Sequence, residues 1–192
     1  MNPAVLALFL INFVLIGLLP LTFFKRDGRL NLMWWLTAAP YVLSSASLVA
    51  SAAGRLPPLI DIAAPVGPVL ALLSVPFAVG SVSLIAYTLG SHRVQIALWH
   101  QLNDAPRQIV THGAYKRIRH PFYSAFLLAL LGAALFCPQA GTLGAFAYAL
   151  VIMNHTAASE ERRLAASEFG AEYREYMRRT GRFLPRLGGE GT

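Results

Sequence analysis

The residues best suited to chemistry lie in two short polar segments of the chain. The first, Thr111–Tyr123, combines cations with imidazole and phenol groups: His112, Tyr115, Arg119, His120 and Tyr123. The second contains the adjacent acids Glu160 and Glu161, preceded by Asn154 and His155. A carboxylate pairs with an ammonium group, and a guanidinium pairs with a carboxylate through two parallel hydrogen bonds. Together the two segments therefore suit a ligand that carries both signs of charge.

The chain between these segments is expected to bring them together. Pro121 leads into the apolar run Phe122–Phe136, and proline is well accommodated in the first turn of a helix. A short joint with Pro138 and Gly141 follows, and then a second apolar run, Thr142–Ala158. This pattern predicts an antiparallel helical hairpin with both polar segments at one end.

Within that hairpin we expect Arg119 to pair with the two glutamates. Asn154 and Glu161 are seven residues apart, which is two helical turns, so they should share one helix face.

The composition is that of an integral membrane protein. Of 192 residues, 56% are hydrophobic and 13% are charged, whereas about 25% are charged in soluble domains. The net charge of +7 is attributed to membrane orientation and anionic lipid, and nucleic acid is not expected as a partner. A single cysteine, Cys137, excludes an internal disulfide and a cysteine-based metal cluster. His92, His100 and His112 fit no tight metal-site spacing, and no metal is expected.

Five apolar runs predict an all-α polytopic membrane protein, with residues 1–192 as one membrane domain. The expected transmembrane helices cover about 3–24, 32–54, 66–90, 120–136 and 140–159. Pro40 and Pro76 should kink the second and third, and Trp34 and Trp35 suit an interfacial aromatic belt. A short interfacial helix is expected around Val94–Trp99.

A C-terminal cytoplasmic amphipathic helix is predicted over Glu160–Arg182. Aromatic and apolar residues recur on one face of it at helical spacing: Phe169, Tyr173, Tyr176 and Met177. We expect this stripe to serve in packing or at the membrane interface.

The basic residues predict the orientation. All of the sixteen lysines and arginines except Arg55 fall on one side of the five predicted spans. By the positive-inside rule, the N-terminus is expected outside and the C-terminus in the cytoplasm, with the bacterial inner membrane as the location. Segments 91–119 and 160–186 then form the cytoplasmic site, while Lys116 and Arg117 serve as topology signals.

The order of the motifs resembles the isoprenylcysteine carboxyl methyltransferase and phospholipid methyltransferase family of membrane enzymes. The motifs are His112-Gly113-x-Tyr115, Arg119-His120-Pro121-x-Tyr123, Glu160-Glu161, Phe169-Gly170-x-x-Tyr173-x-x-Tyr176 and Arg182-Phe183-Leu184-Pro185. They cover roughly residues 111–185, and the first hundred residues match only as generic spans. Ala125 stands where many members have glycine, and Thr156 where many have a basic residue.

The resemblance implies S-adenosylmethionine as cofactor, bound at the cytoplasmic side, with a lipophilic small-molecule or lipid substrate that enters from the bilayer. It assigns as cofactor-binding residues His112, Gly113, Tyr115, Arg119, His120, Pro121, Tyr123, Glu160 and Glu161. Catalytic roles fall to Arg119, His120 and Glu161. Asn154 and His155 are candidates for contact with the substrate, or structural hydrogen-bonding groups inside the bundle.

The implied activity is methyl transfer to a lipophilic acceptor, with O-methylation of a carboxyl or hydroxyl on an isoprenoid-like molecule as first choice. N-methylation of a phospholipid amine is the enzymatic alternative, and a small membrane binding or assembly subunit is the non-enzymatic one. A carboxylate is already ionised at neutral pH and needs no base. An amine or phenol needs one, and His120 or His155 would be the candidates.

Overall fold

The protein is all-helical in the parts of the chain that the structure describes. The computed structural model describes residues 1–18, 24, 28–56, 66–91 and 109–186. Its elements in chain order are α1 (Pro3–Leu18), α2 (Leu32–Ala52), α3 (Val66–Ser91), the 3-10 helix η1 (Gly113–Lys116), α4 (Pro121–Phe136), α5 (Ala140–Ala165) and α6 (Gly170–Arg179). Two isolated bridges are the β-structure within these ranges. The helix predicted around Val94–Trp99 lies outside the described residues.

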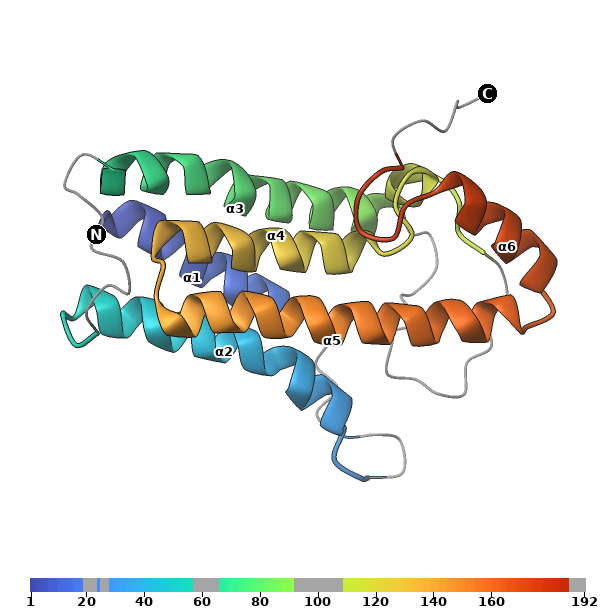
Figure 1. The fold of residues 1–192 in the computed structure, drawn as a ribbon, viewed down its shortest axis with the longest axis horizontal. Helices are drawn as coiled ribbons and strands as arrows, with labels where there is room; N and C mark the ends of the chain where they lie inside the picture. The colour runs from blue at the N-terminus through green and yellow to red at the C-terminus, as the bar shows by residue number, and fades with distance from the viewer. Residues whose placement is uncertain (19–23, 25–27, 57–65, 92–108, 187–192) are drawn as a thin grey trace.

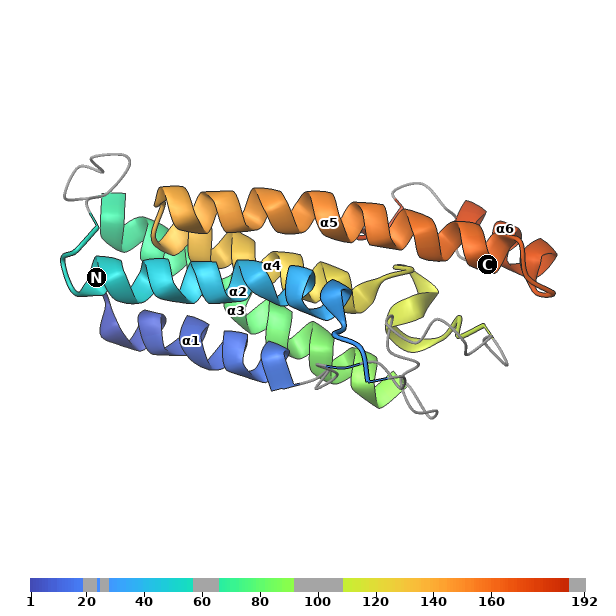
Figure 2. The same ribbon diagram turned by 90° about the horizontal axis from the view of Figure 1, so that it is seen from below.

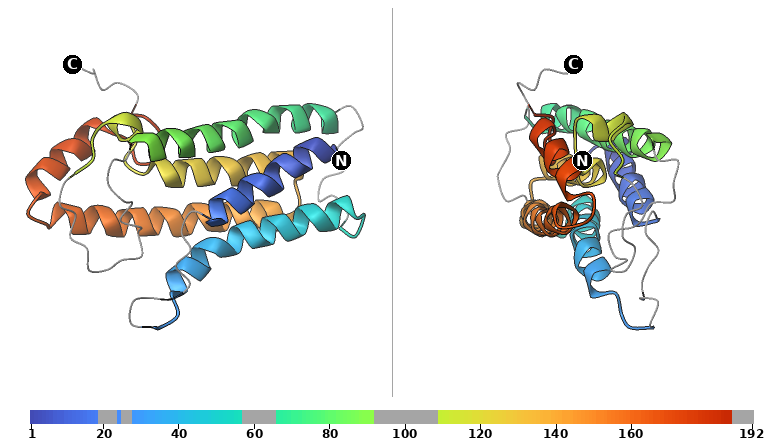
Figure 3. Two further views of the ribbon diagram at one scale, coloured as in Figure 1. Left: turned by 180° about the vertical axis from the view of Figure 1, so that it is seen from behind. Right: turned by 90° about the vertical axis from the view of Figure 1, so that its right-hand side faces the viewer.

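Helices α1 to α5 run along the long axis of the molecule and alternate in direction (Figures 1 and 2). The end of α3, the start of α4 and the last turns of α5 lie at one end of the bundle, with η1 and α6 beside them (Figure 3). The N-terminus lies at the opposite end (Figure 1). The predicted hairpin of α4 and α5 is thus confirmed, and both polar segments are at the same end.

The helices follow the predicted runs closely, but their membrane crossing is supported only in part. Two of them, α2 and α3, are long and apolar enough to cross a membrane; α1 and α4 are apolar but shorter. Helix α5 has the length for a span, but its last turns carry charged residues. Five transmembrane helices therefore remain a prediction.

Small residues let the helices approach closely. On α4, Ala125, Ala129 and Ala133 recur every fourth residue and are fully buried. A Cβ atom placed on Gly132 would lie 2.8 Å from Cβ of Phe77 on α3 and 2.9 Å from the ring of Phe9 on α1. Close packing through small side chains is typical of helices that associate in membranes.

Aromatic rings fill the middle of the bundle. Phe9 of α1 stacks on Phe136 of α4, with ring centroids 5.7 Å apart. The ring of Tyr41 on α2 contacts the rings of Phe13 and Phe126 edge to face, with centroid distances of 5.7 Å and 6.1 Å. These contacts join three helices that are distant in sequence and hold α4 in position for the site at its N-terminus.

Pro40 illustrates how the bundle absorbs a helix-interrupting residue. It lies inside α2, and its missing N–H leaves the carbonyl of Leu36 without its helical partner. The hydroxyl of Tyr148 on α5 donates a hydrogen bond to that carbonyl at 3.1 Å. A neighbouring helix therefore satisfies the carbonyl that the proline frees.

The C-terminal region differs from the prediction of one helix over Glu160–Arg182. Helix α5 continues past both glutamates to Ala165, and α6 begins only at Gly170. A Cβ atom on Gly170 would collide with the carbonyl of Ala165, so the sharp turn requires glycine there. Arg174 Nη1 donates to the same carbonyl at 2.7 Å and helps to end α5. The glutamates therefore lie on the rigid helix of the hairpin.

Candidate active site

The turn before α4 and the last turns of α5 meet through an ion pair. Arg119 Nε donates to Glu161 Oε1 at 2.8 Å, and the two side chains are only 11% and 7% exposed. This confirms the predicted pairing of Arg119 across the hairpin for Glu161. Pro121 is the first residue of α4, as predicted, and follows directly on this turn.

A second arginine, Arg182, completes the coordination of Glu161. Its Nη2 lies 2.5 Å from Glu161 Oε2, and its Nε lies 3.2 Å from both carboxylate oxygens. Its Nη1 donates to Asn154 Oδ1 at 2.6 Å, so Asn154 and Glu161 share one face of α5, as predicted. No role of Arg182 was predicted from the sequence, although this residue opens the last motif of the resemblance.

Backbone pairing brings Arg182 to this position. Arg119 N–H donates to Gly181 O at 2.8 Å, Gly181 N–H to Arg117 O at 3.1 Å, and His120 N–H to Arg182 O at 3.1 Å. Ser124 Oγ, on the first turn of α4, donates to Phe183 O at 2.6 Å. Residues 180–183 therefore lie as an extended segment along the turn that precedes α4.

Arg119 also holds this segment directly. Its Nη1 donates to Met177 O at 3.2 Å and to the carbonyl of Thr180. Its contacts thus join α5, α6 and the segment that follows α6.

Glu160 has a different set of partners. Tyr123 donates its hydroxyl hydrogen to Glu160 Oε1 at 2.8 Å, and His120 Nδ1 lies 3.5 Å from Oε2. The His120 ring stacks on the Tyr123 ring, with the ring centroids 5.3 Å apart and an angle of 3° between the ring planes. His120 Nε2 is buried and lies 3.3 Å from Glu161 Oε1, outside hydrogen-bonding geometry. His120 is therefore placed between the two acids.

The pKa values of the two glutamates are shifted in opposite directions. Burial alone would raise the pKa of Glu161, but His120, Arg182 and Arg119 together outweigh burial and hold that pKa well below its usual range. For Glu160, burial dominates and raises the pKa, although His120 and Tyr123 oppose it. Glu161 is therefore held as a carboxylate, whereas Glu160 takes up a proton at a higher pH than an ordinary glutamate does.

Tyrosines from three segments surround the acids. Tyr173 and Tyr176 on α6 are 3% and 4% exposed, which confirms the packing role predicted for their stripe. Tyr176 donates its hydroxyl hydrogen to the Tyr115 carbonyl at 2.6 Å. Burial raises the pKa of Tyr115, and the nearby groups of Tyr176 and Glu160 raise it further, so this phenol interacts electrostatically with Glu160.

Other predicted site residues lie farther along this end of the bundle. His112 Nε2 lies 2.9 Å from Ser91 O at the end of α3. Gly113 has a φ of +60°, and a Cβ atom there would collide with Ser91, so this close approach requires glycine. Asn154 and His155 are both exposed on α5, which is contrary to the prediction that they are hydrogen-bonding groups inside the bundle.

The family comparison covers the residues that build this site. Residues 85–166 match the model of the isoprenylcysteine carboxyl methyltransferase family. The resemblance to this family is confirmed over these residues. The matched range includes the Arg119–His120–Pro121 turn, Tyr123 and both glutamates, whereas Arg182 lies beyond its end.

One curated protein is similar in sequence to part of the chain. It is the cobalt-zinc-cadmium resistance protein CzcN of Cupriavidus metallidurans, 36% identical over 113 residues. The alignment covers 55% of this chain and 52% of that protein, so the chain spans about half the length of this relative. No solved structure matches the chain.

Within the described ranges, no group of three His, Cys, Asp or Glu side chains is placed to hold a metal ion.

Proposed function

We propose that this protein is an integral membrane methyltransferase that uses S-adenosylmethionine and acts on a lipophilic acceptor. One observation carries the proposal: within the family match, the Arg119–His120 turn lies directly against Glu160 and Glu161. Buried ionisable groups where a chain leaves the membrane are costly to retain and mark a functional site. The proposed topology places this site at the cytoplasmic face.

The cofactor suits Glu160 better than Glu161. Both oxygens of Glu161 already accept hydrogen bonds from arginines. Glu160 Oε2 faces His120 at the longer distance of 3.5 Å, which leaves it open to an ammonium group. We therefore assign Glu160 to the amino group of S-adenosylmethionine, which when bound supplies an electrophilic methyl group on a sulfonium.

The other polar groups position the site. Arg119 donates to Glu161, Met177 and Thr180, and Arg182 donates to Glu161 and Asn154. We assign these arginines to holding the turn, α5 and the C-terminal segment in register. Tyr115 and Tyr123, which lie near Glu160, suit contact with an adenine ring or a sulfonium through their aromatic faces.

The acceptor is proposed to be lipophilic and to reach the site from the bilayer. O-methylation of a carboxyl or hydroxyl on an isoprenoid-like molecule is our first choice. A carboxylate needs only alignment with the methyl group, and alignment supplies about 7–11 kcal/mol of a barrier. For a hydroxyl, His120 beside Glu160 offers a proton acceptor within the site. Asn154, which accepts a hydrogen bond from Arg182, and the neighbouring His155 are both exposed on α5 and are candidates for the acceptor side.

A transfer assay tests this function. Membranes with and without the protein are incubated with S-adenosylmethionine carrying a labelled methyl group, and the lipid extract is analysed by mass spectrometry. We expect label in a base-labile ester or an ether of an isoprenoid-like lipid, only in membranes with the protein. Label in a phospholipid amine would indicate N-methylation of a phospholipid in place of O-methylation. No transfer to any lipid would contradict the enzymatic function.

A further inference from the structure

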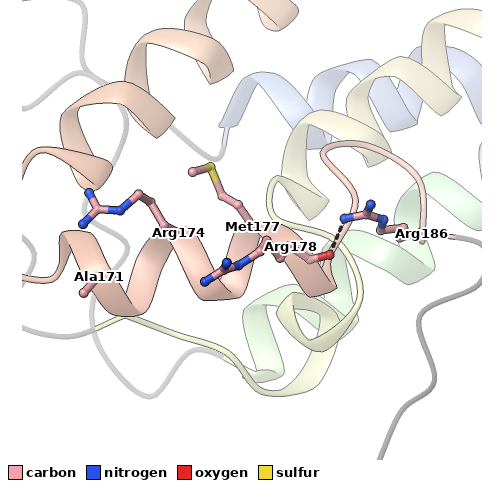
Figure 4. Close-up of a pocket in the computed structure, with 5 residues that line it drawn as sticks. All are labelled: Ala171, Arg174, Met177, Arg178 and Arg186. Atoms are coloured by element: carbon pink, nitrogen blue, oxygen red, sulfur yellow. Dashed lines mark hydrogen bonds between the residues drawn. The ribbon is translucent and has the colours of Figure 1, made fainter.

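A basic hollow lies on the outer side of α6, apart from the acid pair. Its lining residues are Ala171, Arg174, Met177, Arg178 and Arg186 (Figure 4). All three arginines are exposed. The hollow thus combines three cations with a thioether and a methyl group.

The arginines are anchored but keep donors for a ligand. Arg174 uses Nη1 on the carbonyl of Ala165, and Arg186 uses Nη1 on the carbonyl of Arg178 (Figure 4). Arg178 pairs with Glu175 at 2.6 Å, in a contact where both side chains are largely exposed. A guanidinium has five N–H donors, so most donors of Arg174 and Arg186 remain for an anion. Their planar forks match the oxygens of a phosphate.

The hollow lies close to the level at which α4 begins. Gly181, three residues after Arg178, is bonded to the backbone of Arg117 and Arg119, and α4 starts at Pro121. In the proposed topology, the start of α4 is where the chain enters the bilayer. The arginines then lie at the depth of the lipid phosphates.

An exposed leucine lies two residues before Arg186, one of the residues that line the hollow. Leu184 is 75% exposed, although its neighbour Phe183 is tied to α4 through Ser124 and packs against the ring of His120 at 6.3 Å. Leu184 is two residues from Arg186, which lines the hollow. An apolar side chain next to cations suits the boundary between acyl chains and headgroups.

We infer that this hollow binds the phosphate of an anionic phospholipid, with Arg174, Arg178 and Arg186 around the headgroup and Leu184 against the acyl chains. This rests on the membrane topology in the proposed function, but not on methyl transfer. A phospholipid is favoured over a soluble phosphate because a soluble ligand would make no use of exposed Leu184. Arginines near a membrane surface attract anionic lipids in particular.

The test measures lipid retention by the full-length protein in detergent. Phosphatidylglycerol and phosphatidylcholine are titrated, and bound lipid is counted by native mass spectrometry. The variant Arg174→Gln/Arg186→Gln is compared with Arg162→Gln/Arg179→Gln, which removes the same charge from exposed positions that do not line the hollow. We expect the first variant to bind phosphatidylglycerol about tenfold more weakly and the control to stay close to wild type.

Equal losses in both variants, or equal binding of phosphatidylcholine by the wild type, would overturn the inference. Displacement of the lipid by glycerol phosphate at matched concentration would assign the hollow to a soluble ligand instead. Arg186→Gln and Leu184→Ser, made singly, serve if the double variant does not fold, and each should weaken phosphatidylglycerol binding. S-Adenosylmethionine binding is measured on the same samples to separate the two proposals. Failure to bind S-adenosylmethionine would contradict the proposed function, but not the lipid site.

Discussion

At the scale of single residues, the two adjacent glutamates have different roles because they have different partners. Glu161 accepts hydrogen bonds from Arg119 and Arg182, and its side chain is 7% exposed. Glu160 instead contacts the phenol of Tyr123 and the imidazole of His120. Glu161 is therefore expected to hold the structure together, and Glu160 to meet the cofactor.

Replacing Glu161 tests its structural role. In the Glu161→Gln variant, Arg119 and Arg182 lose their common anion, and breaking a buried pair costs about 3 kcal/mol or more. The expected result is a lower melting temperature in detergent, measured by tryptophan fluorescence. Glu168→Gln, at an exposed position, is the matched control and should melt like wild type. Equal melting of both variants would refute the structural role.

The pH dependence of stability follows from the same carboxylate. The folded pKa of Glu161 lies below its ordinary value of 4.5, so its contribution is complete above that pH and is lost as the pH falls toward the folded pKa. The pKa of Glu160 is raised, so its own effect on stability has the opposite sign above pH 4.5. Melting temperatures should therefore fall steeply in wild type only below pH 4.5, down to about pH 3, and less steeply in Glu161→Gln. Parallel curves would contradict this assignment.

The sequence could predict some of these contacts and not others. The pairing of Arg119 with Glu161 was predictable, because the hairpin leaves opposite charges at one end. The contact of Arg182 was not, because it depends on backbone bonds between residues 180–183 and the turn before α4. An extended pairing this short leaves no periodicity in the sequence.

At the scale of helices, the bounds of the apolar runs were predictable, and the break between α5 and α6 was not. Apolar and charged residues alternate at helical spacing across this break, so the pattern indicated one helix. The interruption depends on Gly170, whose close approach to the Ala165 carbonyl becomes visible only in three dimensions. As a result α6 folds back beside the acids, and its tyrosines join the site.

Helix packing is tested at Gly132. A Cβ atom there would lie 2.8 Å from Cβ of Phe77 and 2.9 Å from the ring of Phe9, so Gly132→Ala forces α4 away from α3 and α1. We expect a loss of about 1–3 kcal/mol, measured as a lower melting temperature. Gly144→Ala on α5, where no atom lies within 4 Å of the added carbon, should be neutral or stabilising. The reverse order of the two variants would contradict the packing.

At the scale of the whole molecule, the bundle gathers the polar segments at one end, and the proposed topology makes this end cytoplasmic. Cysteine labelling in intact cells tests the orientation. With Cys137 replaced by alanine, Arg55→Cys should react with a membrane-impermeant maleimide from outside, whereas Arg117→Cys should react only after permeabilisation. Both positions are exposed, so access of the reagent reports the side of the membrane. Labelling in the opposite pattern would invert the topology.

The most direct test of the central claim is a titration of purified protein with S-adenosylmethionine by calorimetry. We predict saturable binding by the wild type, binding weakened about tenfold or more in Glu160→Gln through loss of a charge-assisted hydrogen bond, and unchanged binding in Glu168→Gln. Wild-type affinity in Glu160→Gln, or no binding by the wild type at about millimolar cofactor, would contradict the proposal that the acids and the Arg119–His120 turn form one cofactor site.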